Sequence, residues 1–181
     1  MDKHLRYLTF LILISLFLNS CFKNTKTVHN EEYLPIYSYE EIKKNGKFKY
    51  VTKIDTIILV KHDYSIKEKA ELLAQFISSR YFDNLKINIL SIDTIGKESC
   101  LNIYLIENKK FDSTKIPSWY QYFQGTTGGS WTSNILISNF LQKQYKGDWI
   151  DEIRFYYQGE EIGEWDHIWL GKHKRYDFDN N

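Results

Sequence analysis

The sequence predicts an α+β fold in which helices pack on a mixed, largely antiparallel sheet within a single domain. Three observations lead to this class. Two longer segments have apolar residues at helical spacing, shorter segments alternate apolar and polar residues as strands do, and turn residues between the shorter segments indicate hairpins. The resulting order is strand, helix, hairpin, helix, hairpin. This order is typical of one α+β domain.

The first part of this domain carries a capping signal and then a strand signal. Ser38 and Glu41 have the spacing of a capping box, and Asn45-Gly46 is a stop signal, so we expect a short helix between them. Residues 53–60 are rich in β-branched side chains and are apolar at both parities near their end. This pattern predicts a central strand that is covered on both faces.

A second capping box, Ser65 to Glu68, opens the clearest element of the chain. Apolar residues then recur on one helical stripe, and Asp83-Asn84 follows as a terminator. The stripe consists of Ile66, Ala70, Leu73, Ala74, Ile77 and Tyr81. The sequence therefore predicts a long amphipathic helix here.

Two alternating segments follow this helix. Residues 85–89 and residues 101–105 each place apolar side chains at every second position, and Gly96-Lys97 between them is a turn signal. We expect the two segments to pair as a hairpin.

The second long helix is expected to begin near Ser130 or Thr132, because either side chain could cap it, and to end at Gly147. The glycine-rich residues 125–130 before it predict a tight turn, with an anion-binding loop as the alternative.

The remaining segments indicate a closing hairpin. Residues 149–157 alternate as a strand, and Gln158-Gly159 turns the chain towards a last strand around 162–170. Residues 172–181 are polar, so we expect a frayed tail.

The order of elements from Thr56 to Gly159 resembles the GerMN domain of bacterial envelope and spore-germination proteins. The best local match is a helix over 132–145, followed by a strand over 149–159 that ends in a glycine turn. The aromatic loop 119–131 and the extra C-terminal strand depart from that family. The resemblance implies a small binding or assembly module and no reaction.

The N-terminus carries a second resemblance. Lys3, His4 and Arg6 precede an uncharged apolar run over 7–18, which is shorter than the roughly 20 residues a spanning helix needs. The following Leu18-Asn19-Ser20-Cys21 resembles the cleavage motif of bacterial lipoproteins. An uncleaved membrane helix, or secretion with cleavage elsewhere, is the alternative.

The lipoprotein resemblance implies a signal peptide over 1–20, an acylated Cys21 that anchors the chain in the bilayer, and a tether over 21–32. The folded domain then covers 33–171 and lies in the bacterial cell envelope. Phe22 follows the cysteine, where an aspartate is associated with inner-membrane retention. The outer membrane is therefore favoured if the source has two membranes.

Charge and cysteine content restrict the function classes. Residues 1–20 hold two of the 24 basic and one of the 23 acidic residues, so the mature chain has 22 of each. This balance gives no electrostatic reason to expect nucleic acid as a partner. Once Cys21 is acylated, Cys100 has no partner for an intrachain disulfide. No cofactor motif or metal-ligand spacing is present, so we expect neither a cofactor nor a metal.

Trp119, Tyr120, Tyr122 and Trp131 flank the glycine-rich turn and form the preferred candidate for ligand binding. Exposed aromatic rings there could stack on sugars or anchor a protein partner. The alternative is ordinary packing of the loop over the sheet.

The candidate catalytic residues are Glu164, Asp166 and His167, because a carboxylate beside a histidine could orient it as a general base. In a strand, Glu164 and Asp166 would share one face and His167 would lie on the other. The alternative is a structural histidine near a sheet edge.

The sequence thus favours a membrane-anchored, non-catalytic module that binds or scaffolds a protein or glycan ligand. Two alternatives stay open. One is an immunity or inhibitor lipoprotein that blocks a toxin or hydrolase, and the other is a hydrolase that uses His167 with Asp166.

Overall fold

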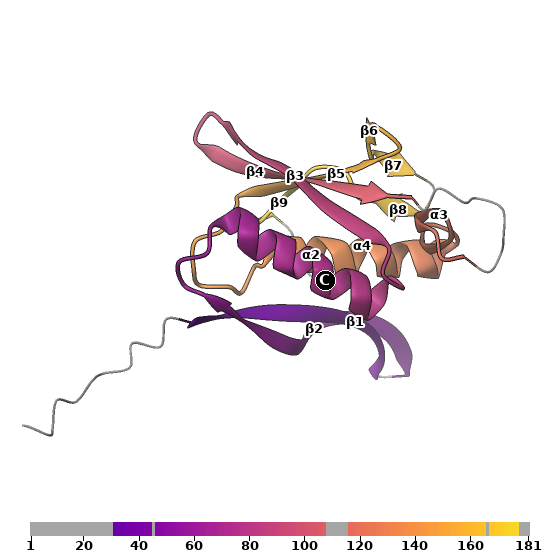
Figure 1. Cartoon of the computed structure of the whole chain (residues 1–181). Coiled ribbons are helices and arrows are strands. Elements are labelled where there is room, and N and C mark those ends of the chain that lie inside the picture. The colour runs from indigo at the N-terminus through magenta and orange to yellow at the C-terminus, as the bar shows by residue number, and fades with distance from the viewer. Residues whose placement is uncertain (1–30, 45, 108–115, 166, 178–181) are drawn as a thin grey trace, which may run out of the picture.

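Two long helices, α2 (Ile66–Tyr81) and α4 (Thr126–Leu141), lie between a two-stranded sheet and a five-stranded sheet (Figure 1). The computed structural model describes residues 31–44, 46–107, 116–165 and 167–177. The predicted α+β class is confirmed, because helices pack on mixed, mostly antiparallel sheets. A continuous cluster of buried apolar side chains joins the three layers into one domain.

The two-stranded sheet is a hairpin of β1 (Glu31–Lys44) and β2 (Lys47–Lys61). The short helix expected after Ser38 is wrong, because Ser38 pairs with Lys53 inside this hairpin. Cross-strand packing outweighs the capping signal: the rings of Tyr39 and Tyr50 stack with centroids 5.3 Å apart.

The expectation that residues 53–60 form a central strand covered on both faces is also wrong. The segment belongs to β2, whose only strand partner in the described part of the chain is β1. The side chains of Ile57 and Leu59 are 51% and 56% exposed. One face of the strand packs on the helices, and the other face meets solvent.

Helix α2 (Ile66–Tyr81) begins at the predicted capping box. The Ser65 hydroxyl accepts a hydrogen bond from the Glu68 amide at 3.2 Å, and the Glu68 carboxylate accepts one from the Ser65 amide at 2.7 Å. Asp83 and Asn84 both have positive φ angles, as expected of terminating residues.

The larger sheet contains the predicted hairpin of β3 (Lys86–Ile95) and β4 (Glu98–Ile106). Strand β5 (Glu152–Tyr157) pairs parallel with β4 and antiparallel with both β6 (Glu160–Glu161) and β9 (His173–Lys174). The last predicted strand, 162–170, contains instead the two short paired strands β7 (Glu164–Trp165) and β8 (Ile168–Trp169).

Helix α3 (Trp119–Tyr122) precedes α4 (Thr126–Leu141), which begins earlier than expected and has Gly125 as its N-cap. Ser130 and Thr132 therefore lie inside the helix. Gln142, in the left-handed conformation, ends it in place of Gly147.

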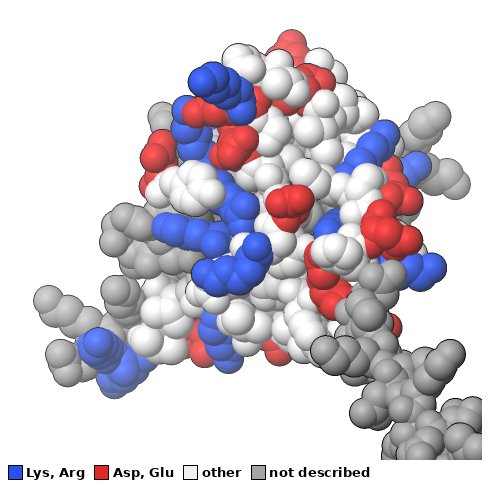
Figure 2. Space-filling model, turned by 90° about the vertical axis from the view of Figure 1, so that its left-hand side faces the viewer, with Lys and Arg blue, Asp and Glu red and all other residues white. Residues whose placement is uncertain are grey.

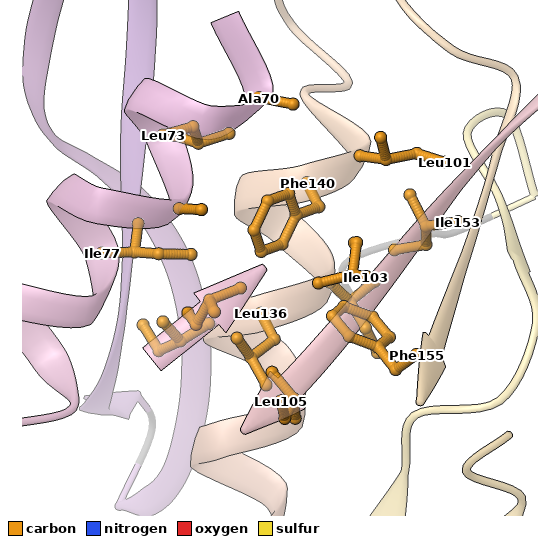
Figure 3. Packing of buried hydrophobic residues seen from close by; sticks show 14 of the residues in the cluster. Ala70, Leu73, Ile77, Leu101, Ile103, Leu105, Leu136, Phe140, Ile153 and Phe155 are labelled. Carbon is orange, nitrogen blue, oxygen red and sulfur yellow. The ribbon is translucent and has the colours of Figure 1, made fainter. Parts of the chain in front are cut away.

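Helix α4 is buried on almost every side, because sheets lie both below and above it (Figure 1). Figure 3 shows Leu136 and Phe140 of α4 beside Ile103 and Phe155 of the larger sheet. On its other side the same helix meets α2. The helix pair is thus the central layer of the core.

The first residues of the expected frayed tail belong to the fold. Strand β9 pairs with β5, and the Arg175 guanidinium is buried against the end of α4. It donates hydrogen bonds to the carbonyls of Gln142 at 3.0 Å and Tyr145 at 2.7 Å. No helix in the described ranges is long and apolar enough to span a membrane.

Candidate functional site

The outer side of the β1–β2 hairpin exposes a group of large apolar side chains, which we call the hairpin face. Its members are Tyr33, Ile54, Ile57 and Leu59, whose exposures are 63%, 48%, 51% and 56%. The register pairs Tyr33 with Leu59 and Pro35 with Ile57, so these side chains are neighbours on one surface. Clustered apolar exposure of this kind marks interaction sites in soluble domains.

A groove of about 580 Å³ runs between the hairpin face and residues 144–147. Tyr33, Pro35, Ile54 and Ile57 line its hairpin wall. Its volume lies within the roughly 300–1,000 Å³ of ligand-binding clefts, and it could hold a few side chains of a partner. A second groove, of about 700 Å³ between α2 and β3, has a more polar lining with Glu71, Gln75 and Lys86 among its residues.

Glu32 and Tyr145, which line one part of the first groove, belong to a polar cluster. We call it the Glu32 cluster, and it consists of Glu32, His62, Lys69 and Tyr145. The Lys69 ammonium is buried and lies 2.7 Å from the Glu32 carboxylate and 3.1 Å from the Tyr145 hydroxyl. The Glu32 carboxylate also accepts a hydrogen bond from Tyr145 and pairs with the His62 ring. The hydrogen bond from Lys69 is the largest cause of a lowered pKa at Glu32.

The cluster joins three parts of the chain, because Glu32 lies on β1, Lys69 on α2, and Tyr145 in the loop after α4. Gly147 makes room for it: a Cβ at this position would lie 2.4 Å from the Tyr145 hydroxyl. The residue expected to end a helix therefore permits the close approach of this tyrosine.

Helix α4 fixes the hairpin in place by completing the edge of β1. The Asn139 side chain donates to the Tyr37 carbonyl at 2.8 Å and accepts from the Tyr37 amide at 3.0 Å. The Gln142 side chain donates to the Pro35 carbonyl at 2.7 Å. Pro35 suits this edge, because it has no N–H that would need a second acceptor there.

The four aromatic residues predicted to bind a ligand do not form one exposed surface. The Trp119 side chain is fully buried, and its ring centroid lies 5.0 Å from that of Phe82. The partly buried Trp131 donates its indole N–H to the Tyr39 carbonyl at 3.1 Å. Trp119 therefore contributes to the core and not to a surface, because so large an apolar ring stabilises the fold most when buried.

The two tyrosines of that site differ from each other. Tyr122 is partly buried and donates to Asp83 at 2.8 Å; burial, followed by Asp83, raises its pKa. Tyr120 is 51% exposed. Of the four aromatic residues, Tyr120 is the most exposed.

Of the three candidate catalytic residues, His167 is the one whose side chain the structure describes. Asp166 lies outside the described residues, and Glu164 lies in β7. His167 is exposed in the turn before β8, with its Nδ1 atom 3.4 Å from the Thr126 hydroxyl. Cys21, the candidate acylation site, also lies outside the described residues.

Other chemistry is limited among the described residues. They contain no group of three or more His, Cys, Asp or Glu side chains that could hold a metal ion. The Cys100 thiol is buried, and its pKa is raised to about 11, chiefly by burial. A thiol of this kind is mostly protonated and unreactive at neutral pH.

No family model, curated protein or solved structure matches this chain. The resemblances to lipoproteins and to GerMN domains therefore stay predictions. The hairpin face was missed by sequence reasoning, although Asn45-Gly46 between two alternating segments is itself a hairpin signal.

Proposed function

We propose that this protein is an envelope lipoprotein, anchored through acylated Cys21, whose folded domain binds another protein through the hairpin face without catalysing a reaction. The observation that carries the proposal is the exposure of four large apolar side chains on one side of one hairpin. Fully burying such a side chain contributes about 1.5–3 kcal/mol, so covering the exposed half of each contributes about 1 kcal/mol per residue.

The surroundings of the hairpin face favour a protein over other partners. Protein interfaces combine an apolar centre with a polar rim, and here Glu31, Lys61 and Lys146 lie around the apolar side chains. Positive and negative side chains are interspersed on the end of the molecule seen in Figure 2. A nucleic-acid partner would favour a surface of one charge sign.

The position of the hairpin suits a domain held close to a membrane. Nine residues lie between Cys21 and Glu31, the first residue of β1, so the ten steps from one Cα atom to the other span at most about 35 Å. The hairpin face would therefore work near the lipid surface. Several acyl chains would make this attachment durable, since each buried CH₂ contributes about 0.8 kcal/mol.

The immunity or inhibitor role is a special case of this proposal, in which the bound protein is a toxin or hydrolase. The hydrolase alternative, which uses His167 with Asp166, rests on the sequence pattern alone, because Asp166 lies outside the described residues.

The anchor is tested by labelling cells with a palmitate analogue and separating membranes from soluble protein. We expect label on the wild-type chain in the membrane fraction, and an unlabelled, released chain for Cys21→Ala. Labelling that persists in Cys21→Ala would contradict the anchor.

The binding face is tested by affinity purification from detergent-solubilised host membranes. Leu59→Asp and Ile57→Asp should lose a co-purifying protein that the wild-type chain retains. Leu90→Asp and Ile95→Asp are matched controls, because these side chains on β3 are 48% and 50% exposed and lie in the sheet beyond the helix layer. Equal recovery of the partner by all four variants would refute the hairpin face as the binding surface.

A further inference from the structure

Within the described part of the chain, the outer edge of β2 is an open strand edge. Strand β1 lies between β2 and helix α4, so β1 has partners on both sides. Strand β2 has a strand partner on one side only, among the residues that the structure describes. An open edge presents unpaired N–H and C=O groups that another strand can pair with.

The backbone parity identifies which groups point outward. Pro35 and Tyr37 direct their carbonyls towards α4, so the alternating residues Leu34 and Ile36 direct theirs towards β2. The register places Ile58 opposite Leu34 and Thr56 opposite Ile36. The N–H and C=O groups of Ile57 and Leu59, which alternate with these, therefore point away from β1.

The segment Thr56–Val60 lacks the features that usually protect a strand edge. Natural edges carry charges, prolines or bulges that prevent pairing with another chain. Lysines and the irregularity next to Asp55 protect the first part of β2, whereas Thr56–Val60 is uncharged, regular and rich in β-branched residues. Within this segment, the outward backbone groups of Ile57 and Leu59 are available for pairing.

We propose that a second copy of this chain pairs antiparallel with this segment, with Ile58 on the two-fold axis. This register places Ile57 of each copy opposite Leu59 of the other. These are the residues whose backbone groups point outward, so each such pair can exchange two hydrogen bonds. Isologous contacts of this type are the commonest in homo-oligomers.

Charge complementarity favours the self-pairing. In the antiparallel register, Lys61 of each copy lies next to Asp55 of the other, a carboxylate that also pairs with Arg80 of its own chain. A parallel, in-register pair would place Lys61 opposite Lys61 and Lys53 opposite Lys53. Like charges directly opposite are destabilising in sheets, so the antiparallel arrangement is preferred.

The symmetry is compatible with attachment to one membrane. A two-fold axis through Ile58 and perpendicular to the hairpin turns both hairpin faces, and both Glu31 ends, to the same side. Five paired residues bury less area than a stable interface needs in solution, so confinement to the membrane would favour the dimer. This promotion by the membrane rests on the proposed anchor, whereas the pairing register does not.

A cysteine pair tests the register in the full chain in native membranes. Opposite residues of a hydrogen-bonded antiparallel pair have Cα atoms about 5.5 Å apart, which a disulfide can bridge. Ile57→Cys/Leu59→Cys should give a disulfide-linked dimer on mild oxidation. Leu90→Cys/Ile95→Cys, at equally exposed positions of β3, should give none. Equal cross-linking of the two double variants, or none in either, would overturn the proposal.

A charge exchange separates this inference from the proposed function. Ile57→Lys/Leu59→Lys puts like charges opposite each other across the axis, whereas Ile57→Glu/Leu59→Lys puts opposite charges there. Both variants destroy the apolar hairpin face equally. Energy transfer between labelled chains in vesicles should show self-association weakened at least tenfold in the first and largely restored in the second. Equal self-association of the two variants would refute the register, whatever the result for the partner protein.

Discussion

Asn139→Ala should remove the hydrogen bonds that hold the β1–β2 hairpin against helix α4. The Asn139 side chain is fully buried, and it bonds both the amide and the carbonyl of Tyr37 on the edge of β1. Alanine would leave two buried backbone groups without partners, and each such loss costs about 1–3 kcal/mol. We therefore expect the free energy of unfolding to fall by about 4 kcal/mol.

Asn134→Ala is the matched control on the same helix. Asn134 is also buried, but its side-chain amide donates only to the Ser130 carbonyl one turn earlier. We expect a loss of about 1 kcal/mol there. Urea denaturation followed by circular dichroism measures both values. If the two variants differ by less than 1 kcal/mol, the idea that Asn139 completes the edge of β1 is refuted.

Three further predictions concern single side chains. Gly129→Ala should destabilise the fold by about 1–3 kcal/mol, because the new Cβ would lie 2.3 Å from the His167 carbonyl oxygen. Gly128→Ala is its control: the nearest atom to that Cβ is 3.9 Å away, so thermal melts should show no loss of stability. Glu32→Gln should destabilise at pH 7. The pKa of Glu32 is lowered in the fold, so its contribution is present above the ordinary glutamate pKa of about 4.3 and is lost as the pH falls; denaturation at pH 7 and pH 3 should show the difference shrink. Cys100, with its pKa raised to about 11, should resist thiol reagents at pH 8 until the protein is unfolded; rapid labelling of the native protein would contradict its burial.

Local signals were sufficient where an element depends on its own residues. The capping box at Ser65 and the apolar stripe after it determine α2, and the turn at Gly96 determines the β3–β4 hairpin. In both cases the interacting residues are close in sequence, so the pattern carries the information.

The hairpin β1–β2 shows where local signals failed. Ser38 and Glu41 fit a capping box, yet pairing with residues 50–53 decided their conformation. The sequence also did not predict the exposure of Ile57 and Leu59, for a related reason. A strand that is apolar at both parities reads as buried on both faces, and only the tertiary arrangement shows that one face is open.

The candidate site depends on contacts between distant residues. Lys69 and Tyr145 are 76 positions apart, and the hydrogen bond between them follows from the packing of α2 against the loop after α4. A lone lysine on a helix gives no sign of such a partner. In the aromatic loop, the sequence suggested exposed rings, but Trp119 is buried. Composition alone does not distinguish a buried tryptophan from an exposed one.

The measurement that tests the account most directly is site-specific photo-cross-linking in intact host cells. A photoreactive residue at Leu59, on the hairpin face, should give covalent adducts with a partner protein at the membrane, together with cross-linked dimers of the chain. The same residue at Leu90, which is 48% exposed on β3, should give neither product. Adducts of equal yield from both positions, or adducts from Leu90 alone, would contradict the assignment of binding to the hairpin face.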